Sequence, residues 1–86
     1  MDEIYEQGYA IGKELKGKRH IVERLMRLMD ARARNYDVMK IKVFEVASAV
    51  KKPLPLFFGY LGADDKDYSK ELIYFEMGLL NGSVEE

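Results

Sequence analysis

The segment RHIVERLMRLMDARAR, residues 19–34, decides the fold class of this 86-residue chain. Its apolar residues recur at spacings of three and four, which places them on one face of a helix; they are Ile21, Val22, Leu25, Met26, Leu28 and Met29. Glu23 and Arg27 stand four residues apart, in the orientation that favours an ion pair on a helix surface. The segment predicts an amphipathic helix whose apolar face needs partners elsewhere in the chain.

Other segments supply those partners. Residues 2–16 and 69–80 carry apolar side chains at helical spacing, and the aromatic stretch 56–62, which follows two prolines, predicts one or two short turns. Residues 38–51 are ambiguous, because residues 39–43 alternate between apolar and charged residues as a strand would. We predict a helix there, and a strand over residues 38–46 stays open as the alternative.

The predicted fold is therefore all-α, a small bundle of four to five helices in a single domain over residues 1–82. Asn81-Gly82 is a typical stop signal, so we expect residues 83–86 to form a frayed tail. We expect the phenylalanines to fill the core; they are Phe44, Phe57, Phe58 and Phe75.

Charge is distributed unevenly along the chain. Residues 13–52 hold twelve of the fourteen Lys and Arg residues and five acids, which gives that stretch a net charge of +7. Residues 1–12 carry −3 and residues 53–86 carry −5, so the overall charge of −1 conceals a basic centre between two acidic ends. The basic centre is the strongest functional signal in the sequence.

The composition argues against several classes of protein. There is no cysteine, which excludes disulfide scaffolds and thiolate chemistry. A lone histidine, His20, lies among positive residues and is expected at the surface, and no nucleophile motif or phosphate loop is present. Acids between Asp65 and Glu76 nearly match a calcium loop, but Lys70 stands where that loop needs glycine. We predict no enzyme activity, no metal and no cofactor.

The apolar runs are shorter than a membrane span and no signal peptide is recognisable, so we expect a cytoplasmic protein without membrane contact. A nucleic-acid backbone is the partner that a basic helical face suits best, because arginine binds phosphate bidentately. Tyr36 is a candidate for stacking on a base. The candidate phosphate contacts are Arg24, Arg27, Arg34, Lys40 and Lys42. Alternatively, the acidic ends pair with the basic centre inside the fold or between copies.

A protein-binding module is the competing interpretation, in which the basic centre meets an acidic surface of a partner. Tyrosine is favoured at interfaces, and the candidates for partner contact are Tyr5, Tyr9, Tyr60 and Tyr74. Gly8 and Gly12 leave a smooth helical stripe that another backbone could approach, which would support a homo-oligomer. A helix-turn-helix DNA reader around Asn35 ranks third, because its turn lacks the usual glycine.

The two ends of the chain also carry related motifs. Ile-Tyr-Glu-Gln-Gly-Tyr-Ala-Ile-Gly, residues 4–12, precedes the basic helix, and Tyr-Phe-Glu-Met-Gly-Leu-Leu, residues 74–80, closes the chain. This order resembles the C-terminal helical region of large subunits in class 1 CRISPR effector complexes, which also exists as a separate small subunit. The resemblance implies a non-enzymatic helical bundle in an antiviral ribonucleoprotein, packed on protein partner subunits and holding phosphate through the second and third helices.

Overall fold

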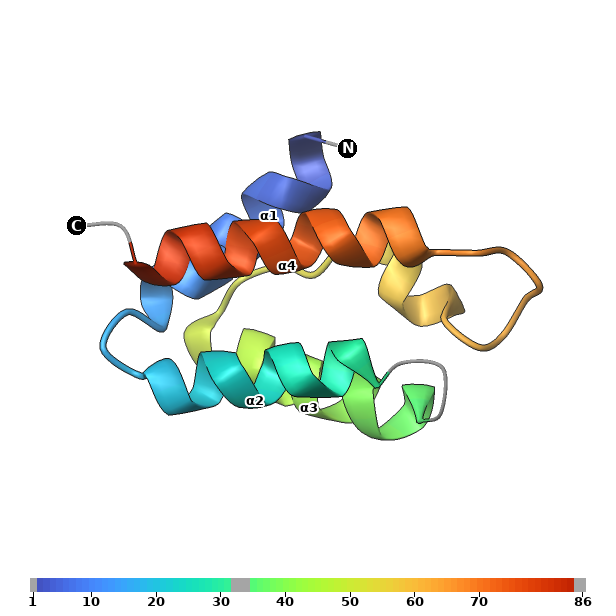
Figure 1. Ribbon diagram of the computed structural model, residues 1–86, viewed down its shortest axis with the longest axis horizontal. Helices are drawn as coiled ribbons and strands as arrows, with labels where there is room; N and C mark the ends of the chain where they lie inside the picture. Colours follow the sequence, from blue (N-terminus) through green and yellow to red (C-terminus); the bar gives the residue numbers. More distant parts are fainter. Residues whose placement is uncertain (1, 32–34, 85–86) are drawn as a thin grey trace.

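The computed structural model describes residues 2–31 and 35–84, and the described chain is all-helical, which confirms the predicted fold class. Four α-helices, α1 (Asp2–Glu14), α2 (Arg19–Asp30), α3 (Tyr36–Val50) and α4 (Ser69–Val84), are joined by loops and one short 3₁₀ helix, η1 (Leu56–Tyr60). The helices form two layers, with α1 and α4 in one and α2 and α3 in the other (Figure 1). The core lies between these layers.

Helical packing explains why residues 36–50 form a helix and not a strand. Met39, Val43 and Ala47 are buried at intervals of four and so line one face of α3. They pack in one core with Val22, Leu25 and Met29 of α2. Large buried side chains of the other elements complete this core; they are Phe58 of η1 and Leu72, Phe75 and Leu79 of α4. The alternation of residues 39–43 is therefore compatible with a helix, because Met39 and Val43, one turn apart, face the core while Ile41 between them is exposed.

The aromatic stretch after the prolines anchors one end of the core. Phe57 and Phe58 of η1 are buried, with ring centroids 4.6 Å apart. Phe58 also meets Phe75 of α4 edge to face at 5.0 Å, and Phe57 stacks on Tyr68 at 5.8 Å. A short, apolar segment thus holds the long connection between α3 and α4 against the bundle.

The contact between α1 and α4 is the most extensive between any two helices, and glycine makes it possible. A Cβ atom at Gly8 would lie 2.5 Å from the Phe75 carbonyl oxygen, inside van der Waals distance. Cβ atoms at the other three glycines of the pair would lie still closer to opposing carbonyl oxygens; these glycines are Gly12, Gly78 and Gly82. The two backbones therefore touch along both helices.

This crossing corrects two predictions from the sequence. The Gly8 and Gly12 stripe does not offer a surface to a second copy, because α4 of the same chain occupies it. The predicted stop at Asn81-Gly82 is also wrong, since α4 continues to Val84 and Gly82 packs on the α1 backbone. Close packing outweighs the local preference of glycine for helix ends.

Candidate nucleic-acid interface

A hollow of about 430 Å³ lies between the outer surfaces of α2 and α3. It brings together three of the predicted phosphate contacts, Arg24 and Arg27 from α2 and Lys42 from α3. Among the described residues, the lining consists of His20, Ile21, Glu23, Arg24, Leu25, Arg27, Lys42, Glu45 and Val46. We call this surface the basic groove.

The helical phase of each element positions these cations. Val22, Leu25 and Met29 turn one face of α2 into the core, which leaves Arg24 and Arg27 on its exposed side. On α3, Lys42 is exposed and stands next to buried Val43. Lys42 lines the hollow from the α3 side. His20 is exposed as predicted, and it lies at the same groove.

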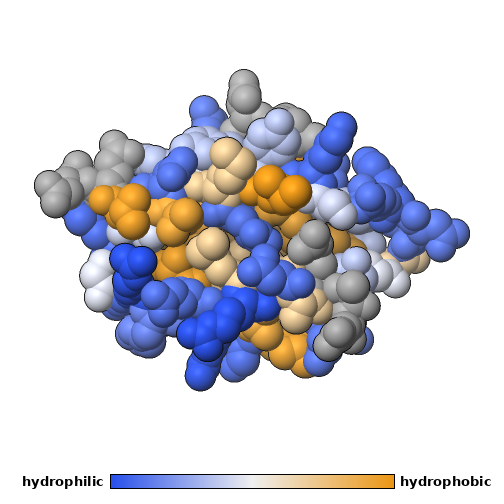
Figure 2. All heavy atoms as spheres, in the orientation of Figure 1, coloured by the Kyte–Doolittle hydropathy of each residue, from blue (hydrophilic) through white to orange (hydrophobic). Residues whose placement is uncertain are grey.

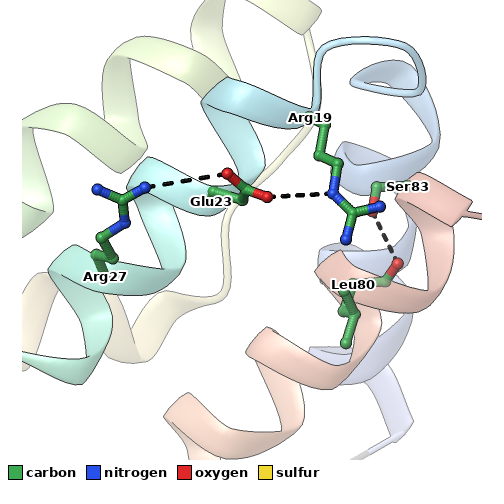
Figure 3. A network of polar contacts seen from close by, with 5 residues as sticks. All are labelled: Arg19, Glu23, Arg27, Leu80 and Ser83. Carbon is green, nitrogen blue, oxygen red and sulfur yellow. Dashed lines mark hydrogen bonds and ion pairs between the residues drawn. The ribbon is translucent and has the colours of Figure 1, made fainter.

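Ion pairs hold some of the cations in place. Arg19 Nε donates to Glu23 Oε1 at 3.1 Å, and Arg27 Nη2 lies 3.9 Å from Glu23 Oε2, so Glu23 stands between two arginines (Figure 3). Lys42 Nζ lies 3.5 Å from Glu45 Oε2. Exposed pairs of this kind contribute at most about 1 kcal/mol, so an incoming anion can replace the carboxylates at small cost.

Arg24 differs from its neighbours, because it makes no ion pair within the described part of the chain. Its guanidinium is exposed and lies at the groove, where its five N–H donors are available to a ligand. Arg24 is thus the cation that an anion can engage without displacing a carboxylate.

One of the predicted contacts, Lys40, does not line the groove. Lys40 Nζ donates to the Leu61 carbonyl oxygen at 2.9 Å and lies 3.7 Å from Asp37 Oδ1. Only 22% of its side chain is exposed, so Lys40 ties α3 to the loop after η1. Arg34 lies outside the described residues. The sequence could not separate Lys40 from Lys42, because both stand on the polar side of the same alternating stretch.

The tyrosines divide into two groups. Tyr5 and Tyr9 are half-buried beside the α1–α4 crossing, and the Tyr5 hydroxyl accepts a hydrogen bond from Asn81 Nδ2 at 2.9 Å. Tyr60 and Tyr74 are exposed and stay available to a partner. Tyr36, the predicted stacking residue, is half-buried against the core, with its ring next to Gly62. Core packing thus leaves Tyr36 only partly exposed, and its stacking on a base stays a prediction.

Phe44 was expected in the core, and that prediction is wrong, since 47% of the residue is exposed. Successive residues of a helix point about 100° apart. Burial of Val43 and Ala47 therefore turns Phe44 outward, and the phase set by Met39, Val43 and Ala47 was the signal that could have shown it. Ile41 is exposed on the same outer side of α3.

An apolar stripe runs along the outer face of α4. Ile73, Met77, Leu80 and Val84 follow one another at spacings of four, three and four, and each is between 41% and 56% exposed. Figure 2 shows hydrophobic residues along α4 and in the hollow between α4 and α2. That hollow, of about 360 Å³, includes Met26 of α2 together with Leu80 and Val84. We call the surface formed by Ile73, Met77, Leu80 and Val84 the α4 stripe.

The described helices include none with both the length and the apolar character that crossing a membrane requires. Among the described residues, no group of three or more His, Cys, Asp or Glu side chains is arranged to hold a metal ion.

Comparisons with family models, with curated proteins and with solved structures find no match to this chain.

Proposed function

We propose that this chain is a non-catalytic accessory protein that holds a nucleic-acid backbone in the basic groove. The observation that carries the proposal is the convergence of Arg24, Arg27 and Lys42, from two helices, on one hollow. Among the described residues that line the hollow, the acids are Glu23 and Glu45, and both are exposed partners of its cations. A surface of this kind offers several charge-assisted hydrogen bonds to phosphate oxygens.

The binding follows from ion exchange. Phosphates bound by Arg24, Arg27 and Lys42 release the counterions condensed on the nucleic acid, which supplies most of the affinity. The guanidinium groups give bidentate contacts, and Lys42 acts as a compact charge on the opposite side of the groove. Phosphate contacts carry no sequence information directly, so we expect binding to depend little on sequence.

The resemblance to small subunits of class 1 CRISPR effector complexes supports a place for the chain in a cytoplasmic ribonucleoprotein. In such an assembly the basic groove faces the nucleic acid, and exposed Tyr60 and Tyr74 are candidates for contact with protein subunits.

The test is fluorescence anisotropy with labelled single- and double-stranded DNA and RNA across a salt series. Binding should weaken linearly in the logarithm of salt concentration, with a slope that becomes smaller by about 0.7–0.9 for each phosphate contact removed. Arg24→Glu and Lys42→Glu should each weaken binding and flatten the slope. Lys70→Glu makes the same charge change at an exposed position of α4 and should have a much smaller effect. Equal losses in all three variants, or no binding at low salt, would reject the groove.

The α4 stripe favours a second candidate function, binding to a protein. Its spacing of four, three and four is the pattern by which one helix packs on another. A second copy of the chain is the first partner to test.

Sedimentation velocity over a wide concentration range tests this second candidate. If the stripe pairs two copies, the wild-type protein should dimerise and Met77→Glu should stay monomeric. Leu56→Glu, at the most exposed apolar residue of η1, is the control and should dimerise like the wild type. A wild-type protein that stays monomeric throughout would exclude self-association through α4.

A further inference from the structure

Another hollow lies on α3, next to the basic groove, and most of the residues that line it are uncharged. It measures about 690 Å³, is shallow and open, and is lined by Ile41, Phe44, Glu45, Ser48 and Ala49. Ile41 is 58% exposed and Phe44 is 47% exposed, so two large apolar side chains face solvent at this hollow. We call this surface the Phe44 hollow.

The two hollows adjoin one another. Glu45 lines both, and its carboxylate pairs with Lys42 of the basic groove at 3.5 Å. A ligand that crosses α3 from the groove therefore passes from cations to an exposed aromatic ring. This order, phosphate-binding charge beside an aromatic platform, is the arrangement by which proteins hold single-stranded nucleic acid.

We propose that the ligand of the basic groove is a single strand, and that one of its bases stacks on Phe44. This inference rests on the proposed function, since the phosphates of the same strand lie at Arg24, Arg27 and Lys42. Every base has a π-face, so stacking on a phenylalanine ring is tolerant of sequence. A duplex keeps its bases inside and can use only the groove, so the protein prefers single strands.

The occupant is a nucleotide and not an apolar helix because of the neighbouring charges. A stacked base brings its own phosphate, which requires a cation within reach. Lys42 lines the groove on one flank of α3 and Phe44 lines the hollow on the other, with Glu45 at both, so a strand that crosses α3 at Glu45 can meet both side chains. Glu45 opposes that phosphate and is held only by an exposed ion pair with Lys42. Neutralising it, in Glu45→Gln, should therefore strengthen binding of a single strand.

The chain has no tryptophan, which provides a direct optical test. Phe44→Trp places a single indole in the Phe44 hollow, and a stacked base quenches indole fluorescence. Two probes of about 12 nucleotides, within the usual range of single-strand binding sites, separate base from backbone. One is oligo-deoxythymidine, and the other is an oligonucleotide of equal length with abasic sugars throughout. Quenching should occur with the first probe and be much weaker with the second.

Affinities of matched variants complete the experiment. Phe44→Leu keeps an apolar side chain that cannot stack, and it should weaken binding of the thymidine probe about tenfold without changing binding of the abasic probe. Phe44→Trp should retain the affinity of the wild type. Leu56→Ala, at a residue 87% exposed on η1, is the apolar control and should behave as the wild type with both probes.

The outcomes separate the two proposals. If Arg24→Glu weakens both probes and Phe44→Leu changes neither, backbone binding stands and stacking is rejected. If Phe44→Leu weakens both probes equally, the Phe44 hollow contacts backbone and stacking is again rejected. If neither probe binds to the wild type, the proposed function fails and the stacking proposal fails with it.

Discussion

Tyr68 couples the loop after η1 to the start of α4. Its side chain is almost entirely buried, and its hydroxyl donates to Asp64 Oδ2 at 2.9 Å. Burial, followed by the hydrogen bond to Asp64 and the charge of that carboxylate, raises the pKa of Tyr68 above its ordinary value of 10.0. The folded protein thus holds the phenolic proton more tightly than the unfolded chain does.

This shift predicts how stability depends on alkaline pH. The contribution of Tyr68 is fully present below pH 10.0 and is lost as the pH rises through the raised pKa of the folded state. Tyr68→Phe should lower stability near neutral pH, where its hydrogen bond is lost, and should make the decline above about pH 10 shallower. Urea unfolding from pH 8 to 11 measures both effects. Parallel curves for the two proteins above pH 10 would contradict this account of Tyr68.

Lys40 and Lys42 differ in what they contact, so substituting each of them provides a second test at the scale of single residues. Lys40→Met removes a partly buried hydrogen bond to the Leu61 carbonyl and should lower the free energy of unfolding by about 1–2 kcal/mol, with little effect on oligonucleotide affinity. Lys42→Met removes only an exposed pair and should leave stability nearly unchanged while it weakens binding. Urea unfolding and anisotropy on both variants measure the two effects. A larger loss of affinity in Lys40→Met than in Lys42→Met would reverse these assignments.

At the scale of helices, the crossing of α1 and α4 is the feature that tolerates substitution least. Gly78→Ala would force a Cβ against the Tyr5 carbonyl oxygen, which is backbone and cannot move aside alone. We expect a loss of at least about 2 kcal/mol, a large share of the stability of a small domain. Gly59→Ala is the matched control, because its Cβ meets no atom within 4 Å, and it should be nearly neutral. Equal urea midpoints for the two variants would mean that the helices can separate at no cost.

The helices show what can be learned from the sequence. The apolar spacing of residues 19–34 predicted α2, and a helix over residues 38–51 is confirmed as α3 despite the alternation within it. The end of α4 was missed because Asn81-Gly82 is a stop signal only when packing against other helices is ignored. Here the close approach of α1 requires glycine at position 82. Local spacing reports the period of a helix, whereas contacts between distant segments decide where it ends.

The candidate site was predictable only in part, for a related reason. The sequence indicated a basic surface, and three of its five candidate cations do converge on one hollow. The role of Lys40 depends on the position of the Leu61 carbonyl, and the exposure of Phe44 depends on which face of α3 meets the core. The role of Lys40 could not be read from residue types, because its partner lies in a distant loop, whereas the phase of Met39, Val43 and Ala47 was a signal for the exposure of Phe44.

At the scale of the whole molecule, the overall charge hides local differences. The helices α2 and α3 carry five Lys and Arg residues and four acids, so their net charge is +1. The acidic ends contribute α1, α4 and the loop before α4 to the opposite side of the bundle (Figure 1). A net charge of −1 is thus compatible with phosphate binding, because the field at the basic groove depends on the nearest charges and not on their sum.

The central claim is that the basic groove between α2 and α3 is the surface that meets nucleic acid. The most direct measurement is a two-dimensional ¹H–¹⁵N NMR titration of the labelled protein with oligo-deoxythymidine at low salt. We predict that the perturbed amides cluster along α2 and α3 around Arg24, Arg27 and Lys42 and extend to Phe44, while α4 from Ile73 to Val84 stays unchanged. Perturbations confined to the α4 stripe, or a spectrum unchanged at saturating oligonucleotide, would contradict the claim.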